Sequence, residues 1–201
     1  MAKVSVVVTV LNEEATIKML LDSLIDQTIK PSEIIIVDGG STDNTVAIIK
    51  KYKVTLLTKT GNRSVGRNYG VSKSKGQIIA FTDAGCVPES GWLKELFKPF
   101  IDPKVQVVSG YYKGLPQNIF EKCLVPYVLV MPDQVKDDFF PSTRSMAMRK
   151  GVGLFDEKLS HNEDYAFAST LKKKGLEFYF APKAVVGWLP RKNLRQAAWM
   201  F

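Results

Sequence analysis

A short apolar run in the middle of the chain constrains the fold more than any other feature. Residues 77–88 read QIIAFTDAGCVP, and Ile78–Phe81 leave no room for a polar face, which is typical of a strand covered on both faces of a sheet. The strand is expected to end in Thr82 and Asp83, because Gly85 and Pro88 follow and break it. Ligands of open α/β sheets bind at the carboxyl ends of the strands, so Asp83 is a candidate site residue. An aspartate that only stabilises a turn would also fit here.

The first hundred residues alternate between strand and helix patterns. Residues 4–10 form a β-branched run, and apolar residues at helical spacing follow over 17–25. Residues 33–37 and 54–57 are also strand-like, and residues 64–72 are helix-like. Strands that alternate with helices predict right-handed β-α-β crossovers and a parallel sheet. We therefore expect an α/β fold with a Rossmann-like, mostly parallel central sheet flanked by helices, followed by a less regular second half.

Polar residues follow the predicted strands, but the common phosphate-binding motifs are absent from the sequence. The chain has neither the GxGxxG of dinucleotide sites nor the GxxxxGK[ST] of P-loops. Carboxylates can hold a base, a ribose or a metal, and arginine can hold a phosphate by a bidentate fork. Asn12 would equally serve as the cap of the first helix. The candidate residues at this edge are Thr9, Asn12, Asp38 and Asp83, with Arg67 nearby.

A second informative segment lies near the end of the chain, where a helix is expected from Glu163 to Lys174 with Asn162 as its cap. Asp164 shares one helical face with the apolar residues that follow, whereas Glu163 points about 100° away. We therefore expect Asp164 to face inward. An inward carboxylate is either held by hydrogen bonds or acts as a base with a raised pKa. The alternative is an acidic pair that only favours the helix dipole.

Four segments in order resemble the family 2 inverting glycosyltransferases with the GT-A fold: VVVTVLNEE, IIIVDGGSTDNT, GRNYGVSKSKGQIIAFTDAGCVP and LFDEKLSHNEDYAF. The resemblance implies a single GT-A domain. Its residues 1–110 would bind a nucleotide-diphospho-sugar donor, linked to UDP or GDP. Residues 111–201 would form the acceptor and catalytic half, which we expect to be cut short at its carboxyl end. The implied activity is inverting sugar transfer to a saccharide or lipid acceptor.

The resemblance also implies roles for individual residues of the donor half. Thr9, Asn12 and Glu13 match the edge of the first strand, where the nucleotide lies. Asp38 matches the acid that contacts the base. Arg67 matches an arginine near the nucleotide and its pyrophosphate.

The implied catalytic residues belong to two acidic motifs. Asp164, in the Glu163-Asp164 pair, matches the acid that removes the proton of the acceptor hydroxyl, and Asp83 matches the first acid of a DxD metal motif. The implied cofactor is a divalent cation, Mg²⁺ or Mn²⁺, with Asp83 as its ligand. In this chain Gly85 stands at the last position of the motif, so the second acid is missing. A weak or absent dependence of activity on metal is therefore also consistent with the sequence. Some relatives have a further histidine ligand, but the chain has only His161, which fits a loop or cap residue better.

Charge and hydropathy bear on the partners and the location. The net charge of +8, from 28 Lys and Arg against 20 Asp and Glu, favours an anionic partner such as phosphate, nucleic acid or an acidic membrane surface. No run approaches the roughly 18 to 20 apolar residues of a membrane span, so a cytoplasmic protein is expected. Residues 188–195 mix basic and bulky apolar side chains, which would suit either a solvated turn or contact with the inner face of a membrane. Residues 194–201 resemble the start of an amphipathic helix.

Three other functions fit parts of the pattern. A nucleotidyltransferase also joins a Rossmann-like sheet to a nucleotide and a metal, but it would need a phosphate loop that the chain lacks. A nucleic-acid-binding domain would group basic and aromatic residues on one face, whereas the lysines here are scattered, so no nucleic-acid partner is expected. A degenerate transferase that binds a nucleotide sugar without turning it over would be consistent with the missing DxD acid.

Overall fold

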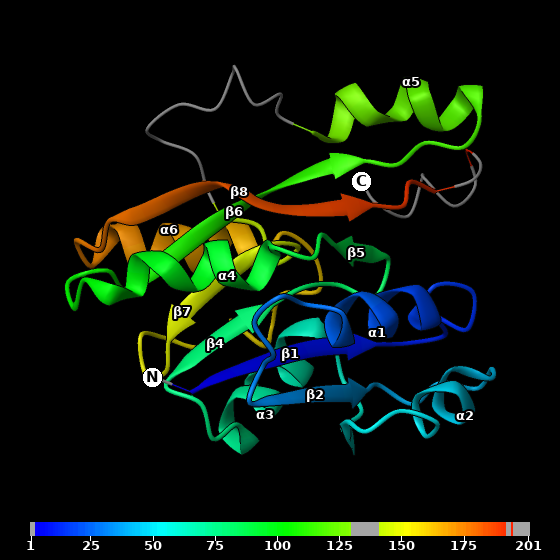
Figure 1. The fold of residues 1–201 in the computed structure, drawn as a ribbon, viewed down its shortest axis with the longest axis horizontal. Coiled ribbons are helices and arrows are strands. Elements are labelled where there is room, and N and C mark those ends of the chain that lie inside the picture. Colours follow the sequence, from blue (N-terminus) through cyan, green and yellow to red (C-terminus); the bar gives the residue numbers. More distant parts are fainter. Residues whose placement is uncertain (1–2, 130–140, 192–193, 195–201) are drawn as a thin grey trace.

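The computed structural model describes residues 3–129, 141–191 and 194, and its strands form one sheet in the order β3-β2-β1-β4-β7-β6-β8-β5 (Figure 1). The strands are β1 (Val4–Val10), β2 (Glu33–Asp38), β3 (Thr55–Thr58), β4 (Ile78–Phe81), β5 (Cys86–Pro88), β6 (Val107–Gly114), β7 (Met146–Arg149) and β8 (Phe178–Trp188). The helices are α1 (Ile17–Ile25), α2 (Thr45–Ile49), α3 (Arg63–Lys73), α4 (Trp92–Phe97), the 3-10 helix η1 (Lys98–Ile101), α5 (Ile119–Val128) and α6 (Glu163–Lys173).

The central strands bury both faces, as their apolar runs predict. Along β1, Val6 and Val8 pack on one face with α1 and α4, and Val7 packs on the other with residues of α3 and α6. Strand β4 divides in the same way, because successive side chains of a strand point to opposite faces. The sheet therefore lies between two helical layers, with α1 and α4 on one side and α3 and α6 on the other (Figure 1).

The expected α/β fold is confirmed, and the sheet is parallel in its first half and mixed in its second. Strands β3, β2, β1 and β4 are parallel neighbours. Strand β7 then pairs antiparallel with both β4 and β6, and β5 pairs antiparallel with β8. Only β6 and β8 run parallel in that half. The expectation of a mostly parallel sheet therefore holds for the half of the chain that is expected to bind the nucleotide, and the sheet as a whole is mixed.

Two glycines bring α3 close to the sheet. A Cβ atom added at Gly66 would lie 2.7 Å from Thr9 Cγ2, and one at Gly70 would lie 2.5 Å from Val7 Cγ1. Both distances are shorter than any real carbon contact, so only glycine allows this approach. The close packing places Arg67, next to Gly66, beneath the carboxyl ends of β1 and β4.

The second half departs from expectation in places. Trp188 ends β8 and is buried, so it is not part of a solvated turn. Helix α4 continues directly into η1, so residues 92–101 form one helical segment. Within the part of the chain that the structure describes, no helix has the length and apolar character to cross a membrane. The amphipathic helix expected over 194–201 lies almost wholly outside the described residues.

Candidate active site

The candidate residues gather at the edge where β1, β2 and β4 end. Asp38 is the last residue of β2, and Asp83 follows β4 by two residues. Helix α6 begins with Glu163 and Asp164, and its first turn reaches this edge from the second half of the chain. Two motifs about eighty residues apart in sequence therefore meet in one site.

Arg67 joins these two motifs through an ion pair on each side. Its Nη1 atom donates a hydrogen bond to Glu163 Oε1 at 2.6 Å, and its Nη2 atom donates one to Asp83 Oδ1 at 3.0 Å. The side chains of Arg67 and Glu163 are only 3% and 6% exposed, whereas that of Asp83 is 32% exposed. The guanidinium also lies 5.4 Å from the ring centre of Phe155. Arg67 thus fixes the distance between the carboxyl end of β4 and the start of α6.

Opposing effects set the protonation of this cluster. Burial alone would raise the pKa of Asp83, but the charges of Arg67, Arg144 and Arg63 hold it below its usual range. Burial likewise would lower the pKa of Arg67, and the carboxylates of Asp83 and Glu163 raise it instead. Asp83 and Arg67 are therefore both ionised at neutral pH.

The expectation that Asp164 faces the apolar core is wrong, because Glu163 takes that place. Glu163 is buried, whereas Asp164 is partly exposed and accepts a hydrogen bond from the backbone N–H of Tyr165 at 2.9 Å. Both residues lie at helical spacing from Phe167 and Leu171, so periodicity permits either to turn inward. Arg67 decides between them, because a buried carboxylate needs a partner and the guanidinium of Arg67 donates to Glu163. Asp164 is left at the open side of the site.

Asn12 does not cap the first helix either. Helix α1 begins later, after Thr16, and Asn12 instead accepts a hydrogen bond from the backbone N–H of Thr42 at 2.8 Å. Its own backbone N–H donates to Ser41 Oγ at 2.9 Å. The backbone N–H of Glu13 donates to Thr45 Oγ1 at 2.7 Å. The loop that follows β1 is therefore bonded to the loop that follows β2, and Asn12 and Glu13 hold the two together.

Asp38 and Thr9 have structural partners of their own at this edge. Asp38 is buried, and its carboxylate accepts hydrogen bonds from the backbone N–H groups of Gly40 and Ser41 at 3.1 and 3.2 Å. Thr9 packs its methyl group against Gly66. Both residues thus shape the rim formed by the two loops.

Arg144 is a member of the site that the sequence motifs did not reveal. It precedes β7, and its guanidinium carbon lies 5.0 Å from the ring centre of Tyr112 and 5.4 Å from that of Trp188. Burial would lower its pKa, but Tyr112, Asp83, Cys86 and Asp164 raise it. Arg144 contacts Tyr112 of β6 and Trp188 of β8 only because the fold brings these distant segments together. A basic residue just before a short apolar run is the sole sequence signal, and it is too common to be specific.

The Asp83-Ala84-Gly85 motif offers few ligands to a metal cation. Within residues 3–129 and 141–191, no three His, Cys, Asp or Glu side chains gather as metal ligands do. Asp83 Oδ1 is already bonded to Arg67, and a Cβ at Gly85 would meet no atom within 4 Å. His161 is exposed and contacts Ser160. Asp83 could still contribute one ligand, because Mg²⁺ is often held by one or two carboxylates together with substrate phosphates and water.

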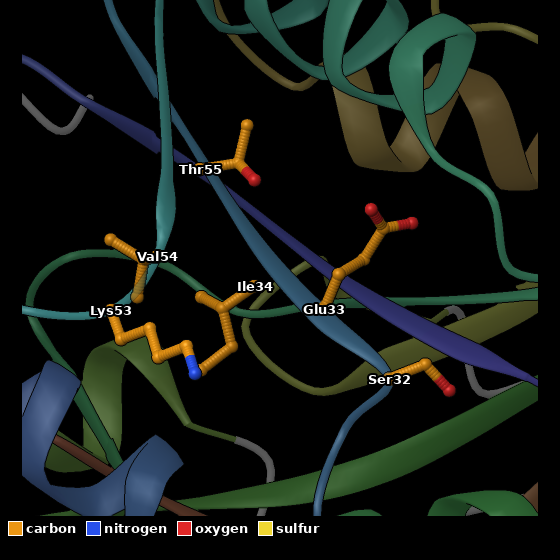
Figure 2. Close-up of a pocket in the computed structure, with 6 residues that line it drawn as sticks. All are labelled: Ser32, Glu33, Ile34, Lys53, Val54 and Thr55. Atoms are coloured by element: carbon orange, nitrogen blue, oxygen red, sulfur yellow. The ribbon is translucent and has the colours of Figure 1, made fainter.

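A hollow of about 270 Å³ lies elsewhere, at the amino ends of β2 and β3. Figure 2 shows its lining residues Ser32, Glu33, Ile34, Lys53, Val54 and Thr55. Glu33 accepts hydrogen bonds from Ser5 Oγ at 2.6 Å and from the backbone N–H of Lys75 at 2.5 Å, so its carboxylate is already satisfied. None of the candidate residues lines this hollow, which lies at the opposite edge of the sheet from Asp38 and Asp83.

Known proteins of related sequence are glycosyltransferases. The chain is 32% identical over 137 residues to poly(ribitol-phosphate) beta-N-acetylglucosaminyltransferase TarP of Staphylococcus aureus, covering 61% of this chain and 42% of TarP. It is 30% identical over 186 residues to TarS of the same species, an enzyme with the same descriptive name, covering 83% of this chain and 32% of TarS. The chain thus spans less than half the length of these relatives.

Solved structures share the fold. The mannosyltransferase PcManGT from Pyrobaculum calidifontis, in complex with GDP-Man and Mn²⁺, superposes with a TM-score of 0.78 at 22% identity, covering 98% of this chain and 59% of that one. S. aureus TarS 1-349 in complex with UDP-GlcNAc superposes with a TM-score of 0.71 at 22% identity, covering 98% and 61%. The GT-A architecture expected from the motifs is thereby confirmed. Residues 5–147, well over half of the chain, match the family described as Glycosyl transferase family 2, and the chain belongs to that family.

Proposed function

We propose that this chain is an inverting glycosyltransferase that moves a sugar from a nucleotide-diphospho-sugar to an acceptor hydroxyl. The observation that carries the proposal is the double ion pair of Arg67. It joins Asp83, at the edge where the donor would bind, to Glu163, at the start of the helix that holds Asp164. A partly exposed carboxylate is thereby held beside a charged strand edge, as a reaction between a donor and an acceptor requires.

The donor half supplies the binding residues in this proposal. The two bonded loops after β1 and β2 would hold the nucleoside, with Asp38 directed at the base and with Thr9, Asn12 and Glu13 shaping the rim. Asp83 would hold a divalent cation, which supplies positive charge to the leaving diphosphate when bound. Arg67 adds fixed positive charge behind Asp83.

Asp164 is the general base of the proposed reaction. Its carboxylate takes the proton of the acceptor hydroxyl while that oxygen attacks the anomeric carbon. The bond from this carbon to the diphosphate oxygen breaks on the opposite side, so the configuration inverts and the nucleoside diphosphate leaves. Glu163, which is buried against Arg67, positions the site and does not take the proton. A single base of this kind typically contributes about 10²- to 10⁴-fold in rate.

The substrates can be narrowed only by analogy. Solved structures of similar fold contain UDP-GlcNAc and GDP-Man, and the relative TarP is named for poly(ribitol-phosphate). We infer a UDP- or GDP-linked donor and a saccharide or lipid-linked acceptor for this chain. Action at the cytoplasmic side of a membrane surface would fit a lipid-linked acceptor and the net charge of +8.

Calorimetric titration tests donor binding. We expect the chain to bind either UDP or GDP, more tightly with Mn²⁺ or Mg²⁺ present. Asp38→Ala should weaken this binding by about 10- to 100-fold, the usual effect of losing a charged hydrogen-bond partner. Asp26→Asn, an exposed charge change after α1, is the matched control and should bind as the unaltered chain does. Failure of both nucleotides to bind would contradict the proposal.

A degenerate homologue that binds the donor without turning it over is the second candidate, and the missing acid at Gly85 favours it. It predicts the same nucleotide binding but no release of nucleoside diphosphate from a nucleotide sugar. Donor turnover therefore separates the two candidates.

A further inference from the structure

Two aromatic rings hold the guanidinium of Arg144 in the site. Its guanidinium carbon lies 5.0 Å from the centre of the Tyr112 ring and 5.4 Å from that of the Trp188 ring, and Trp188 is buried. Contacts of this kind orient a cation and reduce the freedom of its long side chain. The guanidinium is therefore held in place before any ligand binds.

The N–H groups of Arg144 make fewer bonds to carboxylates than those of Arg67. Arg67 gives one hydrogen bond to each of two carboxylates. Among the described residues, Arg144 has no carboxylate within ion-pair distance. Its Nη1 atom donates a long hydrogen bond of 3.5 Å to Ser142 Oγ, and its side chain also interacts with that of Tyr112. A partly buried cation with spare donors is suited to an anionic ligand.

The metal motif Asp83-Ala84-Gly85 lacks one of the two carboxylates of a DxD motif. Gly85 stands where a DxD motif would have its second acid, and a Cβ at Gly85 would meet no atom within 4 Å. The charge of Arg144 acts on Asp83, the remaining acid of that motif, and helps to keep it ionised. An arginine thus supplies positive charge to Asp83, in a motif that lacks its second acid.

We propose that Arg144 binds the diphosphate of the donor and supplies part of the positive charge that a DxD-bound cation would otherwise provide. This inference rests on the proposed function, because it assumes a nucleoside diphosphate at the carboxyl edge of the sheet. The guanidinium would donate two hydrogen bonds to oxygens of the phosphate next to the sugar, and its charge would stabilise that phosphate as it leaves.

Comparison of nucleoside diphosphates with monophosphates tests this role without reference to activity. UDP, GDP, UMP and GMP are titrated into the whole chain by calorimetry in the absence of divalent cations. Arg144→Gln should weaken binding of the preferred diphosphate by about 10- to 100-fold and leave the monophosphate of the same base unchanged within about twofold. Lys183→Gln removes an exposed charge from β8 and should change neither. Circular dichroism and the thermal midpoint of each variant verify that it is folded.

A second variant keeps Arg144 intact. Gly85→Asp restores the missing acid in open space, so Mn²⁺ should increase the UDP or GDP affinity of this variant at least tenfold more than it does for the unaltered chain. If Arg144→Gln weakens the mono- and diphosphate equally, or neither, the role assigned to Arg144 is wrong even though the proposed function stands. If the unaltered chain binds neither diphosphate, with or without Mn²⁺, the proposed function fails and the inference fails with it.

Discussion

At the scale of single residues, the site depends on which carboxylate receives a buried partner. Arg67 selects Glu163 and Asp83, and this choice leaves Asp164 at the open side of the site. Adjacent acidic residues on one helix can therefore have different surroundings, one buried against a cation and one partly exposed. The difference arises from a residue about a hundred positions away in the sequence rather than from either acid.

Removal of the buried cation should destabilise the fold strongly. Arg67→Met leaves Glu163 buried without a partner, so we expect the free energy of unfolding to fall by about 3 to 5 kcal/mol. The double variant Arg67→Met/Glu163→Met should recover most of this loss, since apolar residues can replace a buried pair. Lys18→Met, which breaks the exposed Lys18–Asp22 pair, is the control and should leave unfolding unchanged. Denaturant unfolding followed by circular dichroism measures all three, and a single Arg67→Met as stable as the control would disprove the structural role.

At the scale of elements, helix α3 is the part that sets the geometry of the site. Its glycines allow it to lie against β1, and Arg67 extends from the same helix toward α6. Asn62 caps the helix by accepting a hydrogen bond from the backbone N–H of Val65, and its amide also donates to the carbonyl of Glu157 at 2.7 Å. The helix is thus tied both to the sheet and to the loop that leads to α6.

A methyl group at the contact between α3 and β1 should be costly. Gly70→Ala places a Cβ atom 2.5 Å from Val7 Cγ1, and Val7 is fully buried and cannot move aside. We expect a loss of about 1 to 3 kcal/mol from overpacking, although alanine is the better helix former. Ser72→Ala on the exposed face of α3 should stay within about 0.5 kcal/mol of the unaltered chain. Thermal unfolding compares them, and a Gly70→Ala variant of increased stability would refute the close contact.

The sequence predicts elements well where one strand or helix determines its own pattern. The buried runs of β1, β2 and β4 and the helical spacing of α1 and α6 predict these elements close to their bounds. The sequence does not predict strands β7 and β8. Each depends on neighbours from distant parts of the chain, and β6 also carries an irregularity between Ser109 and Tyr111 where it pairs with β8. Local pattern carries no information about such pairings.

At the scale of the whole molecule, the two halves of the chain meet at one sheet edge. The first half contributes the strand ends and the bonded loops, and the second contributes α6 together with the segment before β7 that holds Arg144. The motifs predicted which residues belong to this edge, because the order of strands and turns implies it. They could not predict that Glu163 turns inward or that Arg144 joins, since both follow from contacts across the two halves.

The most direct measurement of the central claim is the release of nucleoside diphosphate from a donor, with UDP-GlcNAc and GDP-Man as probes. Water or an added saccharide takes the place of the acceptor. Asp164→Asn should bind the donor as the unaltered chain does and release nucleoside diphosphate about 10²- to 10⁴-fold more slowly, because the acceptor proton has no base. Asp156→Asn, an exposed change in the preceding loop, should act at the normal rate. Equal release by Asp164→Asn and the unaltered chain, or a loss explained wholly by weaker donor binding, would contradict the role of Asp164.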